Sequence, residues 1–218
     1  MTPPKTRLAL FLFICGMAAA ARIGAAARSG EPQAATPAAP PTIVTMTLPG
    51  TIVQQYTSVK DLWIKTANAM PAESYAFQPM PDMRTFAGGM GHILASDISQ
   101  CSSLIGRKHA LSGVDLEKTL TTKADTVRAV ADTFAFCDEY FLKVGDSTPI
   151  ADAYVNMNGR RNGEPVVFKV SNGASIVHFL THNNEMYGYL AVYMRLKGIV
   201  PPSSVRATAG SGRDGRGK

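Results

Sequence analysis

The chain has 218 residues, 45% of them hydrophobic, and a formal net charge of +6 at pH 7. Eight of the 22 lysines and arginines, but only two of the 16 acidic residues, lie outside the central part of the chain, residues 46–205. The central part therefore carries 14 residues of each sign. It lacks the excess of basic residues that binds phosphate backbones, so we exclude nucleic acid as a partner.

The chain begins with the features of a secretory signal peptide. Lys5 and Arg7 precede an apolar run from Leu8 to Ala21, and small residues offer a cleavage site near Ala27. The run is short for a stable bilayer crossing. We therefore expect a signal peptide over residues 1–27 and a periplasmic or secreted protein. A retained single-pass anchor is the alternative.

Two segments of biased composition flank the rest of the chain. Residues 28–45 are rich in proline and alanine, and residues 206–218 are rich in glycine and arginine. Neither can bury enough apolar surface to order itself, so we predict a disordered linker and a disordered tail. Residues 46–205 remain as one domain, long enough for a single core.

Four segments of this domain show the three- and four-residue spacing of apolar side chains that is typical of amphipathic helices. They run from a cap at Thr57 or Ser58 to Met70, from Thr85 past Ile105, from about Lys123 to Val144, and from about Ala174 to Lys197. Gly198 and Pro201 form a C-terminal stop for the last segment. Each helix needs partners for its apolar face, so the sequence predicts an all-α fold, an antiparallel four-helix bundle.

The two longest connections, residues 108–122 and 145–173, are crossovers in this scheme. Within the second, residues 153–157 and 166–170 flank the stretch NGRRNGEP. Two apolar runs around a turn rich in Asn and Gly predict a β-hairpin. A bundle crossover without strands would give a similar pattern and is the alternative.

Two cysteines follow the signal segment. Cys101 and Cys137 each lie on the apolar stripe of a predicted helix. An oxidising compartment would allow them to form a disulfide if their Cα atoms come within ~7 Å. The alternative is a pair of buried reduced thiols, which pack as small apolar side chains.

His92 lies nearly opposite the apolar stripe of the second helix, at 100° per residue. Its helical neighbours are all small: Gly88, Gly89, Ala95, Ser96 and Ser99. An ordinary exposed face would carry Lys, Glu or Gln, so we expect another helix or a ligand to approach this face. An incidental histidine beside glycines is the alternative.

His178 and His182 are four residues apart on the fourth helix and therefore share a face, which Glu185 and Met186 continue. If His92 meets this pair from a facing helix, three nitrogen donors could hold a zinc-like ion at ~2.0–2.1 Å, with one position open to water. The spacing alone is also compatible with two stacked histidines that bind nothing.

Two longer stretches resemble a known family. These are YAFQPMPDMRTFAGGMGHI (75–93) and HNNEMYGYLAVYMRLKGIVPPSS (182–204), and they resemble the DinB-like proteins over roughly residues 54–204. The resemblance implies a four-helix bundle with long crossovers, often a homodimer, and a zinc or nickel site. Its ligands would be His92, His182 and a third histidine at the position that Met186 occupies here. Some relatives are transferases or isomerases that use low-molecular-weight thiols.

Met186 departs from the family pattern, because a thioether suits Cu(I) and is a poor donor to zinc or magnesium. Three alternatives stay open. His178 moves into the site from one turn earlier, Glu185 supplies a carboxylate, or the site has lost its metal.

Two classes of function follow from these residues. The first is a metal-assisted enzyme, a thiol transferase or a hydrolase, in which the ion activates water or a thiol cosubstrate and Glu185 is the candidate general base. The second is a non-catalytic periplasmic module, binding or structural, whose cleft holds a small molecule or nothing.

Overall fold

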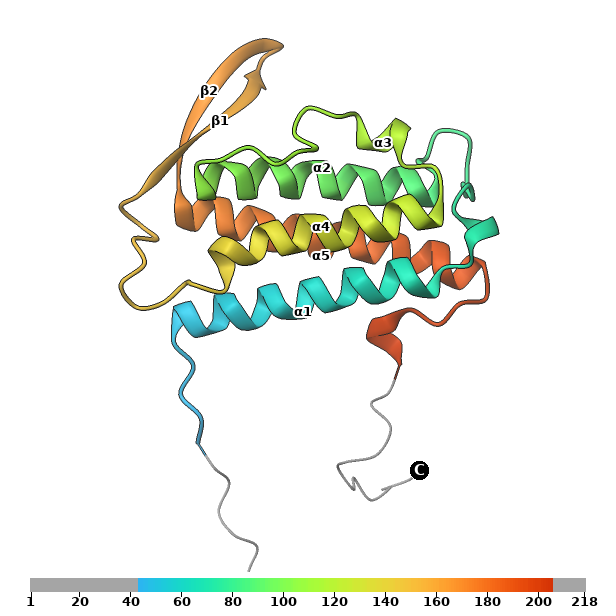
Figure 1. Cartoon of the computed structure of the whole chain (residues 1–218), viewed down its shortest axis with the longest axis horizontal. Helices are drawn as coiled ribbons and strands as arrows, with labels where there is room; N and C mark the ends of the chain where they lie inside the picture. The colour runs from blue at the N-terminus through green and yellow to red at the C-terminus, as the bar shows by residue number, and fades with distance from the viewer. Residues whose placement is uncertain (1–42, 206–218) are drawn as a thin grey trace, which may run out of the picture. The chain divides into compact units, whose positions relative to one another are not determined.

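The computed structural model describes residues 43–205, which form a bundle of four long helices with a β-hairpin (Figure 1). The helices are α1 (Leu48–Ala69), α2 (Phe86–Ile105), α4 (Lys123–Phe141) and α5 (Asn172–Leu196). The expected signal peptide, its anchor alternative, most of the linker and the tail lie outside the described residues. Within residues 43–205, no helix is long and apolar enough to cross a membrane.

Each long helix begins at a hydroxyl residue whose side chain accepts a hydrogen bond from a backbone N–H of the first turn. These caps are Thr47, Thr85, Thr122 and Ser171. The predicted starts of α2 and α4 are confirmed. The stop after α5 is confirmed as well, because Gly198 has a φ of 74° and the Ile199 N–H donates to the Met194 carbonyl at 2.8 Å.

The predicted start of α1 is wrong, since the helix begins at Leu48. Thr47 caps this earlier start, and a proline fits the first turn. Thr57 and Ser58 lie inside the helix, where their hydroxyls donate to the carbonyls four residues earlier, at 2.8 and 2.9 Å.

The helices form a ring in which α1 contacts α4, α4 contacts α2, α2 contacts α5, and α5 contacts α1. The pairs α1/α4 and α2/α5 are antiparallel, whereas α2/α4 and α1/α5 are parallel (Figure 1). The prediction of an antiparallel bundle is therefore wrong for two of these four pairs. The connection between α2 and α4 allows this, because it returns the chain along the bundle before α4 begins (Figure 1).

The core confirms the predicted apolar stripes and joins them through aromatic rings. Tyr56 of α1 stacks on Phe141 of α4 with 4.3 Å between ring centroids, and Trp63 meets Tyr187 of α5 edge to face. Cys101 and Cys137 form a disulfide between α2 and α4, with 5.3 Å between their Cα atoms. This outcome fits the parallel pairing of these helices, because both cysteines lie late in their own helix.

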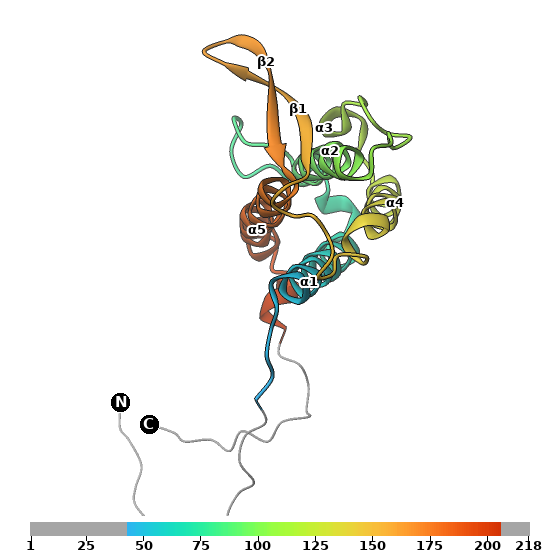
Figure 2. The ribbon, with the colours of Figure 1, turned by 90° about the vertical axis from the view of Figure 1, so that its left-hand side faces the viewer.

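The predicted hairpin is confirmed, with longer strands than expected. β1 (Tyr154–Arg161) pairs antiparallel with β2 (Glu164–Ser171). The turn is only Asn162-Gly163, and both residues have a positive φ, of 52° and 86°. This is the geometry for which Asn-Gly is the preferred two-residue sequence. The ribbon stands off the bundle where α4 ends and α5 begins (Figure 2).

Three short helices complete the fold, and one of them reaches the face of α2 that bears His92. They are η1 (Ala72–Ser74), α3 (Leu116–Thr119) and η2 (Pro202–Ser204). α3 lies in the connection between α2 and α4, where no helix was predicted. It packs against α2, with Leu116 buried.

Candidate functional site

The glycines near the start of α2 allow two other segments to approach its backbone closely. A Cβ on Gly91 would overlap the backbone carbonyl of Leu116 in α3, and a Cβ on Gly89 would lie 2.8 Å from Leu190 Cδ2 in α5. The predicted close approach at the small residues around His92 is thus confirmed at Gly89. The site lies where α2, α3 and α5 meet.

His92 is held from one side by a carboxylate of α3. Its Nδ1 lies 2.5 Å from Glu117 Oε1, and Arg84 Nε donates to the other oxygen of the same carboxylate at 2.7 Å. Arg84, and then the bond to His92, lower the pKa of Glu117, although burial opposes them. An ionised carboxylate can only accept, so Nδ1 carries the proton and Nε2 is left for a ligand.

His182 is held in a similar way by a hydroxyl of α2. Its Nδ1 lies 3.2 Å from Ser96 Oγ, which also accepts a hydrogen bond from Gln100 Nε2 at 3.2 Å. Burial, and then the nearby His92 and His178, lower the pKa of His182. The ring is therefore neutral at pH 7, which is the form that binds a metal or accepts a proton.

The two imidazoles come from facing helices and lie at one pocket. Their ring centroids are 5.3 Å apart, with the ring planes at 87°. The pocket has a volume of about 670 Å³ and is also lined by Glu117, Glu185 and Met186. The structure therefore brings together four residues that the sequence singled out: His92, His182, Glu185 and Met186.

His178 behaves differently from the other predicted ligands. Its ring stacks on that of His182, with 5.5 Å between the ring centroids and 21° between the ring planes. His178 is exposed, however, and is not one of the described residues that line this pocket. Throughout residues 43–205, no three side chains of His, Cys, Asp or Glu are placed to hold a metal ion together. Two imidazoles with oriented rings fit two ligands of a metal site, but the three-nitrogen set of a zinc or nickel site is not formed.

Sequence reasoning missed Glu117. It lies 25 residues after His92, in a short helix with too few apolar positions to show a period. Arg84 lies in the stretch 75–93 that resembles the DinB-like family, but no sequence pattern assigns it to the site. Its position is fixed by Tyr193 of α5, whose hydroxyl donates to the Arg84 carbonyl at 2.9 Å.

A buried polar pair lies directly behind the site. Asn183 Nδ2 donates to Asp97 Oδ1 at 2.7 Å, and both residues are fully buried. Asp97 Oδ2 and Asn183 Oδ1 have no hydrogen-bond partner among the described residues. Burial raises the pKa of Asp97 well above its usual value. A protonated Oδ2 can donate to Asn183 Oδ1 and so pair the two orphaned oxygens.

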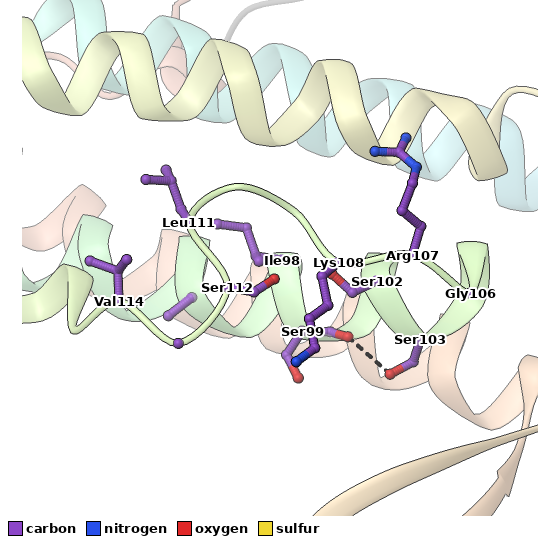
Figure 3. A pocket seen from close by; sticks show the side chains of 12 residues that line it. Ile98, Ser99, Ser102, Ser103, Gly106, Arg107, Lys108, Leu111, Ser112 and Val114 are labelled. Atoms are coloured by element: carbon purple, nitrogen blue, oxygen red, sulfur yellow. Dashed lines mark hydrogen bonds between the residues drawn. The ribbon is translucent and has the colours of Figure 1, made fainter.

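A second pocket, of about 480 Å³, lies farther along α2 and contains none of the candidate site residues (Figure 3). Serines of α2, Leu111 and Lys108 line it. Arg107 points towards α4, where it donates two hydrogen bonds to the Glu139 carboxylate at 2.6 and 2.7 Å. The pocket offers neither paired imidazoles nor a buried charge, so the candidate site is the histidine pocket.

No protein-family model and no curated protein sequence matches this chain. Among solved structures, it is similar to a DinB-like protein from Bacillus cereus, with a TM-score of 0.53 and 18% sequence identity. The similarity covers 73% of this chain and 98% of that one. The expected all-α bundle with long crossovers is thus confirmed, and the chain has the DinB-like fold.

Proposed function

We propose that this protein is an exported DinB-like metal-binding protein, in which His92 and His182 are the two histidine ligands. The observation that carries the proposal is the pair of imidazoles from α2 and α5, 5.3 Å apart at the wall of one pocket. Each ring has its Nδ1 engaged, by Glu117 or by Ser96. A hydrogen bond on the second nitrogen is the usual device that orients a metal-binding histidine.

The surrounding residues support reactivity at such a site as well as binding. A bound ion with an open position would supply Lewis acidity, which activates water or the thiolate of a cosubstrate. Glu117 and Arg84 hold His92 in place, and Glu185 lies at the pocket wall as the candidate general base. A small substrate would enter the pocket between α2 and α5. The enzymatic form of this proposal is therefore a thiol transferase or a hydrolase.

Metal binding is tested on the protein purified without a histidine tag. Zn²⁺, Ni²⁺ and Cu(I) are added separately, and bound metal is measured by inductively coupled plasma mass spectrometry after gel filtration. His92→Ala and His182→Ala should each abolish stoichiometric binding, because each variant loses one of the two histidine ligands and the ion is then held far less tightly.

His178→Ala is the matched control, because His178 is on the same helix and stacks on His182 without lining the pocket. It should leave the stoichiometry unchanged. If His178→Ala and His182→Ala lose metal equally, His178 is a ligand after all. Retention of full binding by both His92→Ala and His182→Ala would refute the proposal.

A non-catalytic binding module for a small molecule is the second candidate. It is favoured by the lack of three His, Cys, Asp or Glu donors placed together in residues 43–205, and by a pocket lined with Arg84, Tyr189 and Tyr193. In that case, thermal unfolding should be unaffected by every metal and raised by an organic ligand recovered by native mass spectrometry.

Export is the part of the proposal that rests on the sequence. A signal peptide over residues 1–27 places the mature N-terminus near Arg28 or Ser29. N-terminal sequencing of protein recovered from the periplasm or the medium tests this directly. An intact Met1 on soluble protein inside the cell would contradict it.

A further inference from the structure

We propose that the His92–His182 pocket binds Cu(I) in preference to Zn²⁺, with Met186 as the third ligand. The inference rests on the proposed metal binding and deepens it by naming the ion. It starts from a mismatch: the pocket brings two imidazoles together without a third nitrogen or carboxylate placed to complete the set.

Met186 brings a further metal-binding atom, its thioether sulfur, to the pocket lined by the two histidines. It lies four residues after His182 on α5, and therefore one helical turn along the same face. The residue is only 7% exposed, and it lines the pocket together with both histidines. A thioether is a soft donor that selects Cu(I), whereas Zn²⁺ favours imidazole, thiolate and carboxylate.

A second thioether lies at the same pocket. Met83 is in the loop before α2, half-buried against the core, and lines the pocket beside Arg84. Two neutral imidazoles and two thioethers carry no negative charge. Thioether donors suit a soft, singly charged ion such as Cu(I).

The Glu117 carboxylate beside His92 is already engaged in hydrogen bonds and is not a free ligand. Glu117 accepts hydrogen bonds from His92 and from Arg84, so the Arg84 guanidinium neutralises it. The described cysteines do not compete either, because Cys101 and Cys137 are joined in a disulfide. The sulfur donors left at the pocket are therefore thioethers.

The experiment measures the affinity of each ion separately in the wild type and three variants. Cu(I) is supplied as its coloured bicinchoninate complex with ascorbate and without oxygen, and its transfer is followed by absorbance. Zn²⁺ is titrated against a chromophoric zinc chelator. The variants are Met186→Leu, which keeps the volume and removes the sulfur, Met186→His, and the control Met194→Leu, a buried methionine of α5 outside the pocket.

We expect Met186→Leu to weaken Cu(I) binding by about tenfold or more and to leave any Zn²⁺ binding unchanged, because the lost donor is a soft one. Met186→His should strengthen Zn²⁺ binding, and Met194→Leu should change neither affinity. X-ray absorption of the Cu(I) form should show a sulfur shell that Met186→Leu reduces and Met194→Leu retains.

The outcomes separate this inference from the proposed function. If the wild type binds an ion through His92 and His182 but Met186→Leu changes neither affinity nor the sulfur shell, the choice of Cu(I) is overturned and metal binding stands. If the wild type binds neither Cu(I) nor Zn²⁺, this inference is overturned, and if it binds no Ni²⁺ either, the proposed metal binding is overturned with it.

Discussion

Glu117 shows how one residue can act on the site through another. Its carboxylate bonds to His92 Nδ1 and to Arg84, so it fixes the orientation and the protonated nitrogen of the ring. Glu117→Gln keeps the shape but removes the charge, and we expect metal affinity to fall by about 10–100-fold, as is usual for partners of this kind. Isothermal titration calorimetry of the wild type and the variant, with the metal that the wild type binds, measures the two affinities.

Glu139→Gln is the control for this substitution. Glu139 is also an exposed glutamate paired with an arginine, but it lies on α4 beside Arg107, away from the histidine pocket. Its replacement should leave metal affinity unchanged. An equal loss in both variants would show that the effect does not pass through His92.

Asp97 predicts a pH dependence of stability. Burial raises its pKa in the folded protein above the ordinary value of 3.8, so the folded state holds the proton where the unfolded state releases it. The free energy of unfolding therefore falls as the pH rises from 3.8 to the raised pKa, by roughly 1.4 kcal/mol for each pKa unit.

Asp97→Asn should remove this dependence, because an amide stays neutral and can make the same reciprocal pair with Asn183. Urea denaturation from pH 3.5 to 8 should show the variant gaining stability over the wild type as the pH rises. Asp132→Asn, on the exposed face of α4, should not do so. A constant difference between Asp97→Asn and wild type at every pH would contradict the protonated Asp97.

At the scale of the elements, the position of α3 depends on a glycine in α2. A Cβ at Gly91 would overlap backbone atoms of Leu116 and Glu117, which cannot rotate away. We expect Gly91→Ala to cost about 1–3 kcal/mol of stability, as overpacking does. It should also weaken metal binding, because α3 carries Glu117. Chemical denaturation and metal titration measure the two effects.

Gly188→Ala is the matched control on α5. Nothing lies within 4 Å of a Cβ at this position, and Gly188 is exposed within the helix. It should raise stability by roughly 0.5–1 kcal/mol through helix propensity alone. A loss of stability there, or none at Gly91, would be inconsistent with this packing.

At the scale of the whole molecule, the disulfide joins two parallel neighbours across 36 residues of sequence. Closing a loop of this length in the unfolded chain contributes about 3–4 kcal/mol to stability. The double variant Cys101→Ala, Cys137→Ala should lose an amount of this order in urea denaturation. Wild-type protein treated with a reductant should approach the same value, and two thiols titrating in denatured, unreduced protein would contradict the bridge.

The sequence predicted the elements of the bundle well, because each local signal is short in range. Apolar spacing located the four helices, and hydroxyl residues before α2 and α4 marked their starts. The start of α1 was missed because Thr57 and Ser58 resemble a cap, and only the helical hydrogen bonds of the folded chain show that they are interior. The direction of the helices was missed too, since connection length permits either direction.

For the site, the sequence by itself determined the candidate residues His92, His178, His182, Glu185 and Met186, but not which of them meet. Tertiary structure placed His92 against His182 and left His178 at the surface. It also brought Glu117 to His92 and Cys101 to Cys137. Helical periodicity assigns each side chain a face of its own helix, whereas the rotation and direction of neighbouring helices come from packing the whole core, and that packing decided which faces share the pocket.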